Sequence, residues 1–137
     1  MIKEIVKDDF FLAQPSADVT ANDLYIADDL LDTIKAHQQT CLGMAANMIG
    51  YLKRMMVVLD EDHYLLLINP QILKTGKSSY MAEEGCLCHQ GTKTLKRYEQ
   101  LKIAYLDRQM KKRIRTFSGL TAQIIQHELD HFEGKLI

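Results

Sequence analysis

Two histidines near the C-terminus constrain this chain more than any other residues. His127 and His131 lie four positions apart in an H-E-x-x-H motif. Because an α-helix turns once in about 3.6 residues, a helix here places both imidazoles on one face, where they can bind a divalent metal ion. Glu128 lies beside them, close enough to handle the proton of a water bound to that ion. The alternative is a helix whose two histidines are hydrogen-bonded polar residues.

A third metal ligand is expected elsewhere, because catalytic zinc-type sites usually take about three protein ligands and leave one position open. The best candidates are Cys86 and Cys88, which flank Leu87. A thiolate is a strong ligand for zinc or ferrous iron. Side chains two positions apart on an extended strand point to the same face, so the spacing does not decide between the two cysteines. The alternative is that both are small buried core residues.

The order of the predicted elements indicates an α+β fold with mainly antiparallel strands, in a single domain that covers residues 1–137. Apolar residues at helical spacing predict a first helix over Ala21–Gln39, with Asp18 or Thr20 as its cap. The last helix is predicted over Gly119–Phe132, and Ser118 can cap it.

Strands are predicted between these helices. Apolar runs around polar turns predict two hairpins, formed by Met55–Asp60 with His63–Asn69 and by Leu101–Leu106 with Arg113–Phe117. Pro70 is expected to end its strand, because proline cannot donate a backbone hydrogen bond to a neighbouring strand. Small residues predict a loop over Cys41–Gly50.

Composition excludes several classes of protein. A chain of 137 residues can bury a core without disulfides, and its net charge of −1 gives no sign of a nucleic-acid partner. No apolar run approaches the roughly 20 residues of a membrane span, and the N-terminus is too charged for a signal peptide. Three cysteines without a secretion signal predict free thiols and a cytoplasmic location. The oligomeric state stays open.

Three segments together resemble peptide deformylase. That family is marked by a G-x-G-L-A-A-x-Q loop, an E-G-C-L-S strand and an H-E-x-D-H helix, in this order. The corresponding segments of this chain are Cys41–Met48 (CLGMAANM), Glu84–Cys88 (EGCLC) and His127–His131 (HELDH). Asn69-Pro70 matches an Asn-Pro step of the family, and the resemblance covers nearly the whole chain.

The resemblance implies mixed, mainly antiparallel strands around a central helix that carries the H-E-x-x-H motif. It also implies hydrolytic removal of the formyl group from the N-terminal formylmethionine of new polypeptides, so the partner would be an N-formyl peptide. Cys86, His127 and His131 would bind one divalent ion, either Fe²⁺ or Zn²⁺, with Ni²⁺ as a further alternative. Glu128 would be the general acid and base.

The resemblance also assigns residues around the substrate. The backbone N–H of Leu87 would donate to the oxyanion that forms at the formyl carbon. Gly43 would run beside the substrate backbone, and Leu42, Leu120 and Ile124 would line a pocket for the methionine side chain. For Leu120 and Ile124, ordinary core packing is the alternative.

The chain departs from the family pattern at three positions near this site. Met48 replaces a glutamine whose side-chain amide helps to bind the oxyanion, and a thioether cannot donate a hydrogen bond. Cys41 replaces a glycine, and Cys88 replaces a serine. These changes predict weakened deformylation. They leave two alternatives, a non-catalytic metal-containing paralogue that binds N-terminal peptides and a metal amidase with another substrate. The presence of Glu128 favours an enzyme, because a binding module needs no general base.

Overall fold

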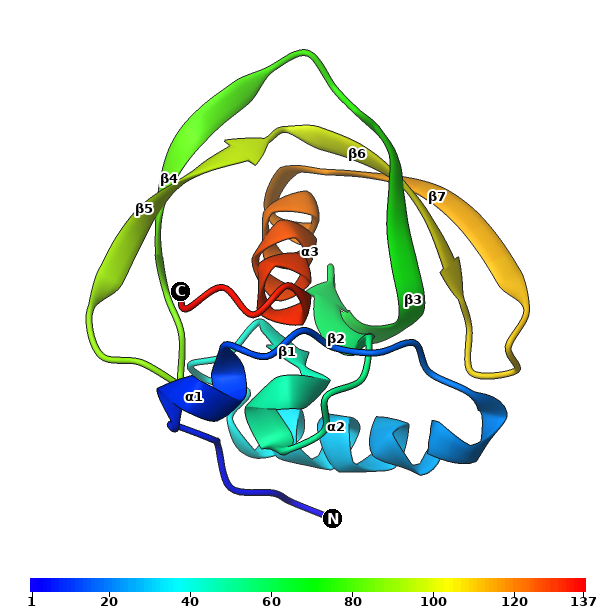
Figure 1. Cartoon of the computed structure of the whole chain (residues 1–137). Helices are drawn as coiled ribbons and strands as arrows, with labels where there is room; N and C mark the ends of the chain where they lie inside the picture. Colours follow the sequence, from blue (N-terminus) through cyan, green and yellow to red (C-terminus); the bar gives the residue numbers. More distant parts are fainter.

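Two antiparallel sheets lie on either side of a helix in the computed structural model, which describes residues 1–137 (Figure 1). The larger sheet has the order β1-β2-β3-β6-β7, with strands at Gly43–Ala45, Met55–Asp60, His63–Thr75, Gln100–Leu106 and Lys112–Ser118. The smaller sheet pairs β4 with β5, at Ser79–Gly85 and Thr92–Tyr98. Every strand pairing within the two sheets is antiparallel, which confirms the predicted α+β fold class.

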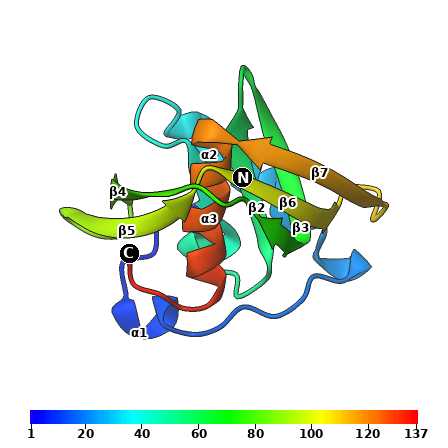
Figure 2. The same ribbon diagram turned by 90° about the horizontal axis from the view of Figure 1, so that it is seen from above.

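The helix between the sheets is α3, Gly119–Phe132, and its bounds are those predicted from the sequence. It contacts strands of both sheets, and Figure 2 shows it between the β4–β5 hairpin and the larger sheet. The remaining helices are α1 (Asp9–Leu12), α2 (Tyr25–Ala36) and two short 3₁₀ helices, Ala21–Asp23 and Ala46–Ile49. A helix in this position buries polar as well as apolar side chains, so its polar residues need partners.

The first predicted helix is shorter than expected and is divided. Residues Ala21–Asp23 form a 3₁₀ helix, and α2 starts only at Tyr25 and ends at Ala36. Thr20 rather than Asp18 is the capping residue, and its backbone N–H donates to the Asp23 carboxylate at 2.8 Å. Buried apolar residues of α2 pack against the larger sheet at helical spacing: Ile26, Ala27, Leu30 and Ile34.

The prediction that Pro70 ends its strand is wrong. Strand β3 continues through Asn69-Pro70 to Thr75, and its second half pairs with β6. The register shifts between Ile68 and Gln71, and Asn69 adopts a positive φ of 48°. The Asn69 side chain holds this bend by accepting from the Val19 N–H at 2.8 Å and donating to the Val19 carbonyl at 3.1 Å. Proline is tolerated at such a bulge because no regular ladder hydrogen bond is required there.

Two further elements differ from the sequence prediction. The segment Cys41–Gly50, predicted as a loop, contains β1 and the 3₁₀ helix Ala46–Ile49. The apolar pattern does not predict the β4–β5 hairpin, and only the segment Glu84–Cys88 is expected as a strand, from the family resemblance. The strands of this hairpin carry few apolar residues, and two of its buried positions are the charged residues Glu84 and Arg97, so apolar alternation gave no signal there.

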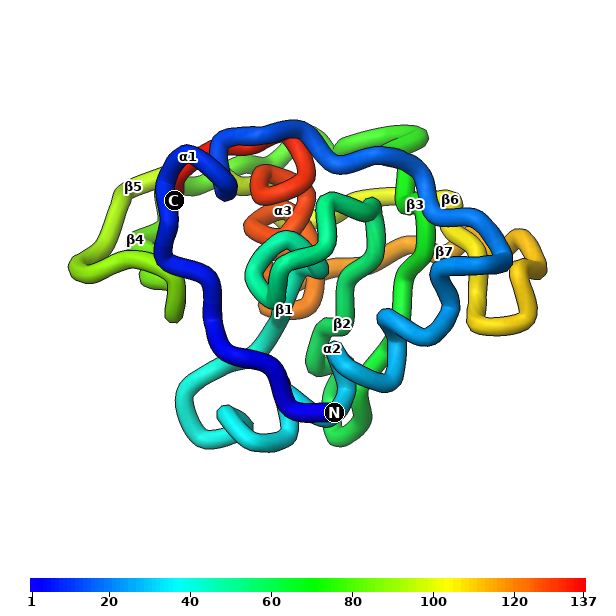
Figure 3. Tube along the Cα trace, turned by 60° about the horizontal axis from the view of Figure 1, so that its bottom comes forward, coloured from blue at the N-terminus to red at the C-terminus, as the bar shows by residue number.

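The N- and C-terminal segments of the chain meet on one face of the molecule. Figure 3 shows α1 beside the C-terminal residues that follow α3. The Ser16 N–H donates to the Phe132 carbonyl at 2.9 Å, and a Cβ on Gly134 would lie 2.3 Å from the Ala13 carbonyl oxygen. No helix of the molecule combines the length and the apolar character that a membrane crossing requires.

Truncating a leucine of α2 should show how much this packing stabilises the fold. Leu30 is fully buried against the larger sheet. Leu30→Ala should lower the free energy of unfolding by about 2–5 kcal/mol, because it removes buried contacts and leaves a cavity. The matched control is Leu73→Ala in β3, where the leucine is exposed and the change should stay within about 0.5 kcal/mol. Urea unfolding measures both, and equal effects would contradict the proposed packing.

Candidate metal centre and its pocket

Cys86, His127 and His131 lie together where the end of β4 faces α3. The Cys86 Sγ atom is 3.4 Å from Nε2 of His131, and the two imidazole rings are 5.0 Å apart between centroids. Contact with Cys88 and burial raise the pKa of the Cys86 thiol to about 11, although hydrogen bonds to both histidines act to lower it. The structure therefore brings together the three residues that the sequence proposed as ligands.

Cys88 lies in the same cluster. Its Sγ atom is 3.1 Å from the Cys86 sulfur, and the side-chain donor atoms of Cys86, Cys88 and His131 all lie within 4.8 Å of one another. The expectation of an extended strand here is wrong, because β4 ends at Gly85 and the two cysteines follow in a turn. The chain must turn at this point to begin β5, and the turn brings the sulfurs together.

Glu84 and Arg97 orient His127, a role that the sequence did not indicate. The Glu84 carboxylate accepts from Nδ1 of His127 at 2.7 Å. This contact places the ring proton on Nδ1 and leaves Nε2 free to act as a ligand. Arg97 donates to both oxygens of Glu84, at 2.8 and 2.9 Å, and to Asp130 at 2.8 Å. In the sequence, Glu84 and Arg97 are two charged residues among other polar residues, and nothing there indicates that they are buried partners of His127.

The charge of Glu84 is strongly favoured by these contacts. Burial alone would raise its pKa, but the hydrogen bonds from His127 and Arg97 outweigh burial and lower the pKa to about 2, against an ordinary value of 4.5. Since the pKa is lowered in the folded protein, the stabilisation is present above the ordinary carboxyl pKa. It is lost as the pH falls through the folded value near 2.

Neutral side chains fix α3 further. Gln123 donates to Glu84 at 3.1 Å and accepts from the hydroxyl of Tyr80 at 3.0 Å. Gln126 accepts from the Tyr98 N–H at 2.8 Å and donates to the Tyr98 carbonyl at 2.9 Å. These bonds hold the helix against the β4–β5 hairpin, so the position of His127 is fixed from both elements.

Glu128 differs from Glu84 because it has no charged partner at hydrogen-bond distance. It is only 3% exposed, and its Oε1 atom has no hydrogen-bond partner. Burial raises its pKa to about 7. The Nδ1 atom of His131 is also buried without a partner. A thiol, two imidazoles and an adjacent carboxylate with a free oxygen form a donor set that fits a divalent metal and a water molecule.

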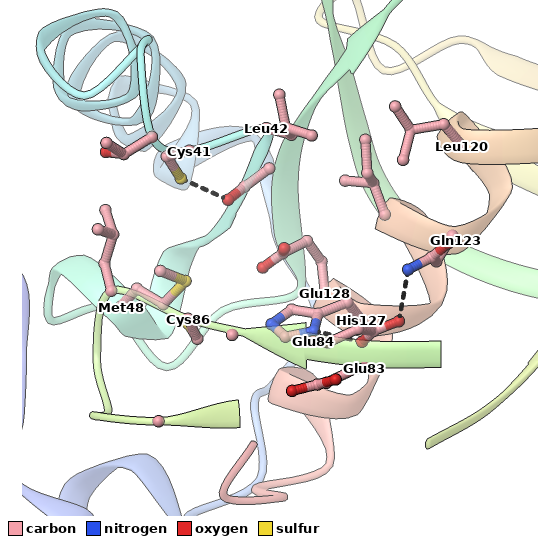
Figure 4. Close-up of a pocket in the computed structure, with 16 residues that line it drawn as sticks. Cys41, Leu42, Met48, Glu83, Glu84, Cys86, Leu120, Gln123, His127 and Glu128 are labelled. Atoms are coloured by element: carbon pink, nitrogen blue, oxygen red, sulfur yellow. Dashed lines mark hydrogen bonds and ion pairs between the residues drawn. The ribbon is translucent and has the colours of Figure 1, made fainter. Parts of the chain in front are cut away.

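A pocket of about 420 Å³ opens beside this cluster (Figure 4). His127 and Glu128 lie in its middle in this view, with Met48 and Cys86 on one side and Leu120 on the other. The residues that the sequence proposed around the substrate all line it: Leu42, Gly43, Leu87, Leu120 and Ile124. Leu42 and Leu120 are 40% and 57% exposed, whereas Ile124 also belongs to the apolar core.

Gly43 is required by close packing at this site. A Cβ atom added there would lie 2.4 Å from Cγ2 of Ile124 and 3.0 Å from Oε2 of Glu128. The backbone of β1 therefore passes directly against α3 beside the catalytic candidate Glu128. Any larger residue would have to displace Ile124 or this carboxylate.

The departures at Cys41 and Met48 lie in the same pocket wall. Met48 is 1% exposed, while the neighbouring Asn47 donates to the His131 carbonyl at 3.1 Å. The Asn47 amide is therefore engaged with the backbone of α3. The Cys41 thiol contacts the Gly43 carbonyl at 2.9 Å, and burial raises its pKa to about 12, so Cys41 is a poor nucleophile.

Comparison with known proteins gives this site its context. A family model described as polypeptide deformylase matches residues 2–137. This chain belongs to the polypeptide deformylase family. The peptide deformylase of Clostridium beijerinckii is 50% identical over 137 residues, 100% of both chains. Peptide deformylase 1 of Rickettsia conorii is 33% identical over 136 residues, 91% of this chain and 77% of that protein.

Solved deformylase structures have the same fold. The class I type b peptide deformylase of Acinetobacter baumannii bound to Met-Ala-Ser gives a TM-score of 0.90 at 29% identity, covering 99% of this chain and 97% of that chain. The same deformylase bound to actinonin gives 0.89 at 30% identity, covering 99% and 95%. The chain is thus a peptide-deformylase-like metallohydrolase of a metal-dependent family that removes N-terminal formyl groups.

Removing Arg97 should strongly destabilise this deformylase-family protein. Arg97→Leu removes the arginine from the buried Glu84 and leaves Asp130 with only the exposed Lys135, so we expect a loss of about 3–5 kcal/mol in the free energy of unfolding. The control is Arg113→Leu. The Arg113 side chain is 58% exposed and forms an ion pair with Asp107, which this variant breaks. That loss should stay below about 1 kcal/mol. Urea unfolding at matched metal content compares them, and equal losses would contradict the role of Arg97.

Proposed function

We propose that this chain removes the formyl group from the N-terminal formylmethionine of new polypeptides. The observation that carries the proposal is Glu128, a buried carboxylate with an unpartnered oxygen on the wall of a pocket shared with Cys86 and His127. This is the position that a general base for hydrolysis requires. The match to the deformylase family over nearly the whole chain supports the substrate class.

We assign the metal to Cys86, His127 and His131, with Fe²⁺ or Zn²⁺ as the ion and Ni²⁺ as an alternative. One thiolate and two imidazoles suit these ions, and Glu84 holds His127 with Nε2 free. When bound, the ion supplies Lewis acidity that polarises a carbonyl group and makes water more acidic. Binding requires the thiol and both imidazoles to be deprotonated, so metal affinity should fall at low pH.

Glu128 carries the proton during the reaction. It takes a proton from the attacking water and later passes one to the departing amine. Burial raises its pKa to about 7, so near neutral pH it can serve in both directions. The backbone N–H of Leu87 donates to the oxyanion that forms at the formyl carbon.

The remaining pocket residues position the peptide. Gly43 lies in β1 against Ile124 and lines the pocket, where its backbone would run beside the peptide. Leu42, Leu120 and Ile124 supply apolar surface for the methionine side chain. Solved relatives bound to Met-Ala-Ser and actinonin support a peptide-sized ligand in this fold.

Glu128→Gln should separate chemistry from binding. The amide keeps the size of the side chain but cannot accept a proton, so hydrolysis of a formyl-methionyl peptide should fall about 10²–10⁴-fold at unchanged metal content. Glu83→Gln is the matched control. Glu83 lines the same pocket but is exposed and accepts from Thr92 at 2.7 Å. The readout is kcat/KM with iron loaded and oxygen excluded.

Two results would contradict this assignment. Equal loss in the Glu83 and Glu128 variants would remove the special role of Glu128. A wild-type protein that binds formyl peptides without hydrolysing them would favour the alternative of a peptide-binding paralogue, which the methionine at position 48 already suggests.

Met48→Gln should raise activity. In the wild type the oxyanion lacks a side-chain donor at this position, and losing one such donor in a well-studied protease costs about 10²–10³ in rate. We therefore propose weak native deformylation and a gain in kcat/KM of up to about that factor in Met48→Gln. Met48→Leu, which offers no donor, should give no gain. Reduced activity in Met48→Gln at equal metal content would mean that the loop stabilises charge in another way.

A further inference from the structure

We propose that Cys88 supplies a second thiolate to the metal ion, so that the resting centre is a Zn²⁺ site with four protein ligands: Cys86, Cys88, His127 and His131. This inference rests on the metal site assigned above and adds one ligand to it. A tetrahedral set of two sulfurs and two nitrogens is the arrangement that zinc prefers. A serine at this position, as in the family pattern, would offer a much poorer zinc ligand than a thiolate.

The distances between the donor atoms support the additional ligand. A tetrahedral zinc ion with Zn–S near 2.3 Å and Zn–N near 2.0–2.1 Å separates two sulfurs by about 3.8 Å and a sulfur from a nitrogen by about 3.6 Å. In the structure, the two cysteine sulfurs are 3.1 Å apart, and Cys86 Sγ is 3.4 Å from Nε2 of His131. These two distances would therefore change by less than about 1 Å on metal binding, and the Cys88 sulfur and the His131 donor atom already lie within 4.8 Å of each other.

The surroundings of Cys88 are polar, which argues against a packing role. Cys88 is 2% exposed, yet it does not belong to the main apolar cluster, whereas Cys41 does. Its sulfur is near the Cys86 sulfur, Nδ1 of His89 at 3.3 Å and the Ile137 carbonyl at 4.0 Å. A buried thiol among such atoms gains little from apolar contact.

His89 is placed to support a thiolate at Cys88. Its Nδ1 atom is 3.0 Å from the Ile137 carbonyl and 3.3 Å from the Cys88 sulfur, so a hydrogen on Nδ1 can be donated to either acceptor. The other ring nitrogen is 2.8 Å from the Asp9 carboxylate, which fixes the ring. Metal-bound ligands are commonly held by outer hydrogen bonds of this kind.

A fourth protein ligand has a consequence for hydrolysis. Catalytic zinc sites keep one position open, whereas sites with four protein ligands are closed. Cys88 would therefore have to leave the ion before substrate and water can react. The release of Cys88 would slow turnover, in addition to the effect of Met48, which offers the oxyanion no side-chain hydrogen bond.

X-ray absorption at the zinc edge tests the proposal directly, because it counts sulfur ligands whether or not the protein turns over substrate. We expect two sulfurs in zinc-loaded wild type, two in Cys41→Ser and one in Cys88→Ser. Cys41 is the matched control, a buried thiol whose sulfur contacts the Gly43 carbonyl. One sulfur in the wild type, or an unchanged count in Cys88→Ser, would overturn the proposal.

The wild-type count decides the question even if a variant does not fold. The result is also separable from the proposed hydrolysis. Two sulfurs in a wild type that hydrolyses no formyl peptide would uphold the additional ligand and reject the function. One sulfur in an active wild type would do the reverse.

Discussion

The buried ion network around Glu84 is the constraint on which the rest of the site depends. Taking the charges of Glu84 and Arg97 out of water is costly unless each finds well-placed partners. The bidentate contact between them, with His127 and Asp130 at the two ends, supplies those partners. Because Glu84 lies on β4, Arg97 on β5 and the other two on α3, the network fixes the hairpin against the helix. The same contacts therefore stabilise the fold and aim His127.

Two glutamates near this network have opposite environments. Glu84 has a cation and a histidine as partners, which hold its pKa near 2, whereas Glu128 has no such partner at hydrogen-bond distance and burial raises its pKa to about 7. Titratable groups whose environments separate their pKa values in this way commonly divide acid–base work from structural work. Here the division agrees with the proposed roles, in which Glu84 orients His127 and Glu128 moves protons.

The parts of the fold that follow apolar periodicity could be predicted from sequence. The bounds of α3 and of β2 agree with the prediction, because α3 carries apolar residues at helical spacing and β2 is a continuous apolar run. The β4–β5 hairpin could not be found in this way, since its buried positions include Glu84 and Arg97. The strand through Pro70 was missed because the bulge depends on hydrogen bonds from Asn69 to Val19, which lies 50 positions away. Such long-range partners leave no local signal.

Only the part of the site that depends on local spacing could be predicted from the sequence. The i, i+4 histidines and the adjacent glutamate are local, so a helix alone brings them together. The choice between Cys86 and Cys88 depends on the turn after β4, and spacing left it open.

The three departures, Cys41, Met48 and Cys88, lie outside α3, which keeps its histidine pair and Glu128. Cys41 and Met48 line the pocket, and the Cys88 sulfur adjoins that of Cys86. The chain thus retains the groups proposed to bind metal and to move protons, while the proposed side-chain donor to the oxyanion is replaced by Met48. A deformylase altered in this way should lose rate before it loses its metal.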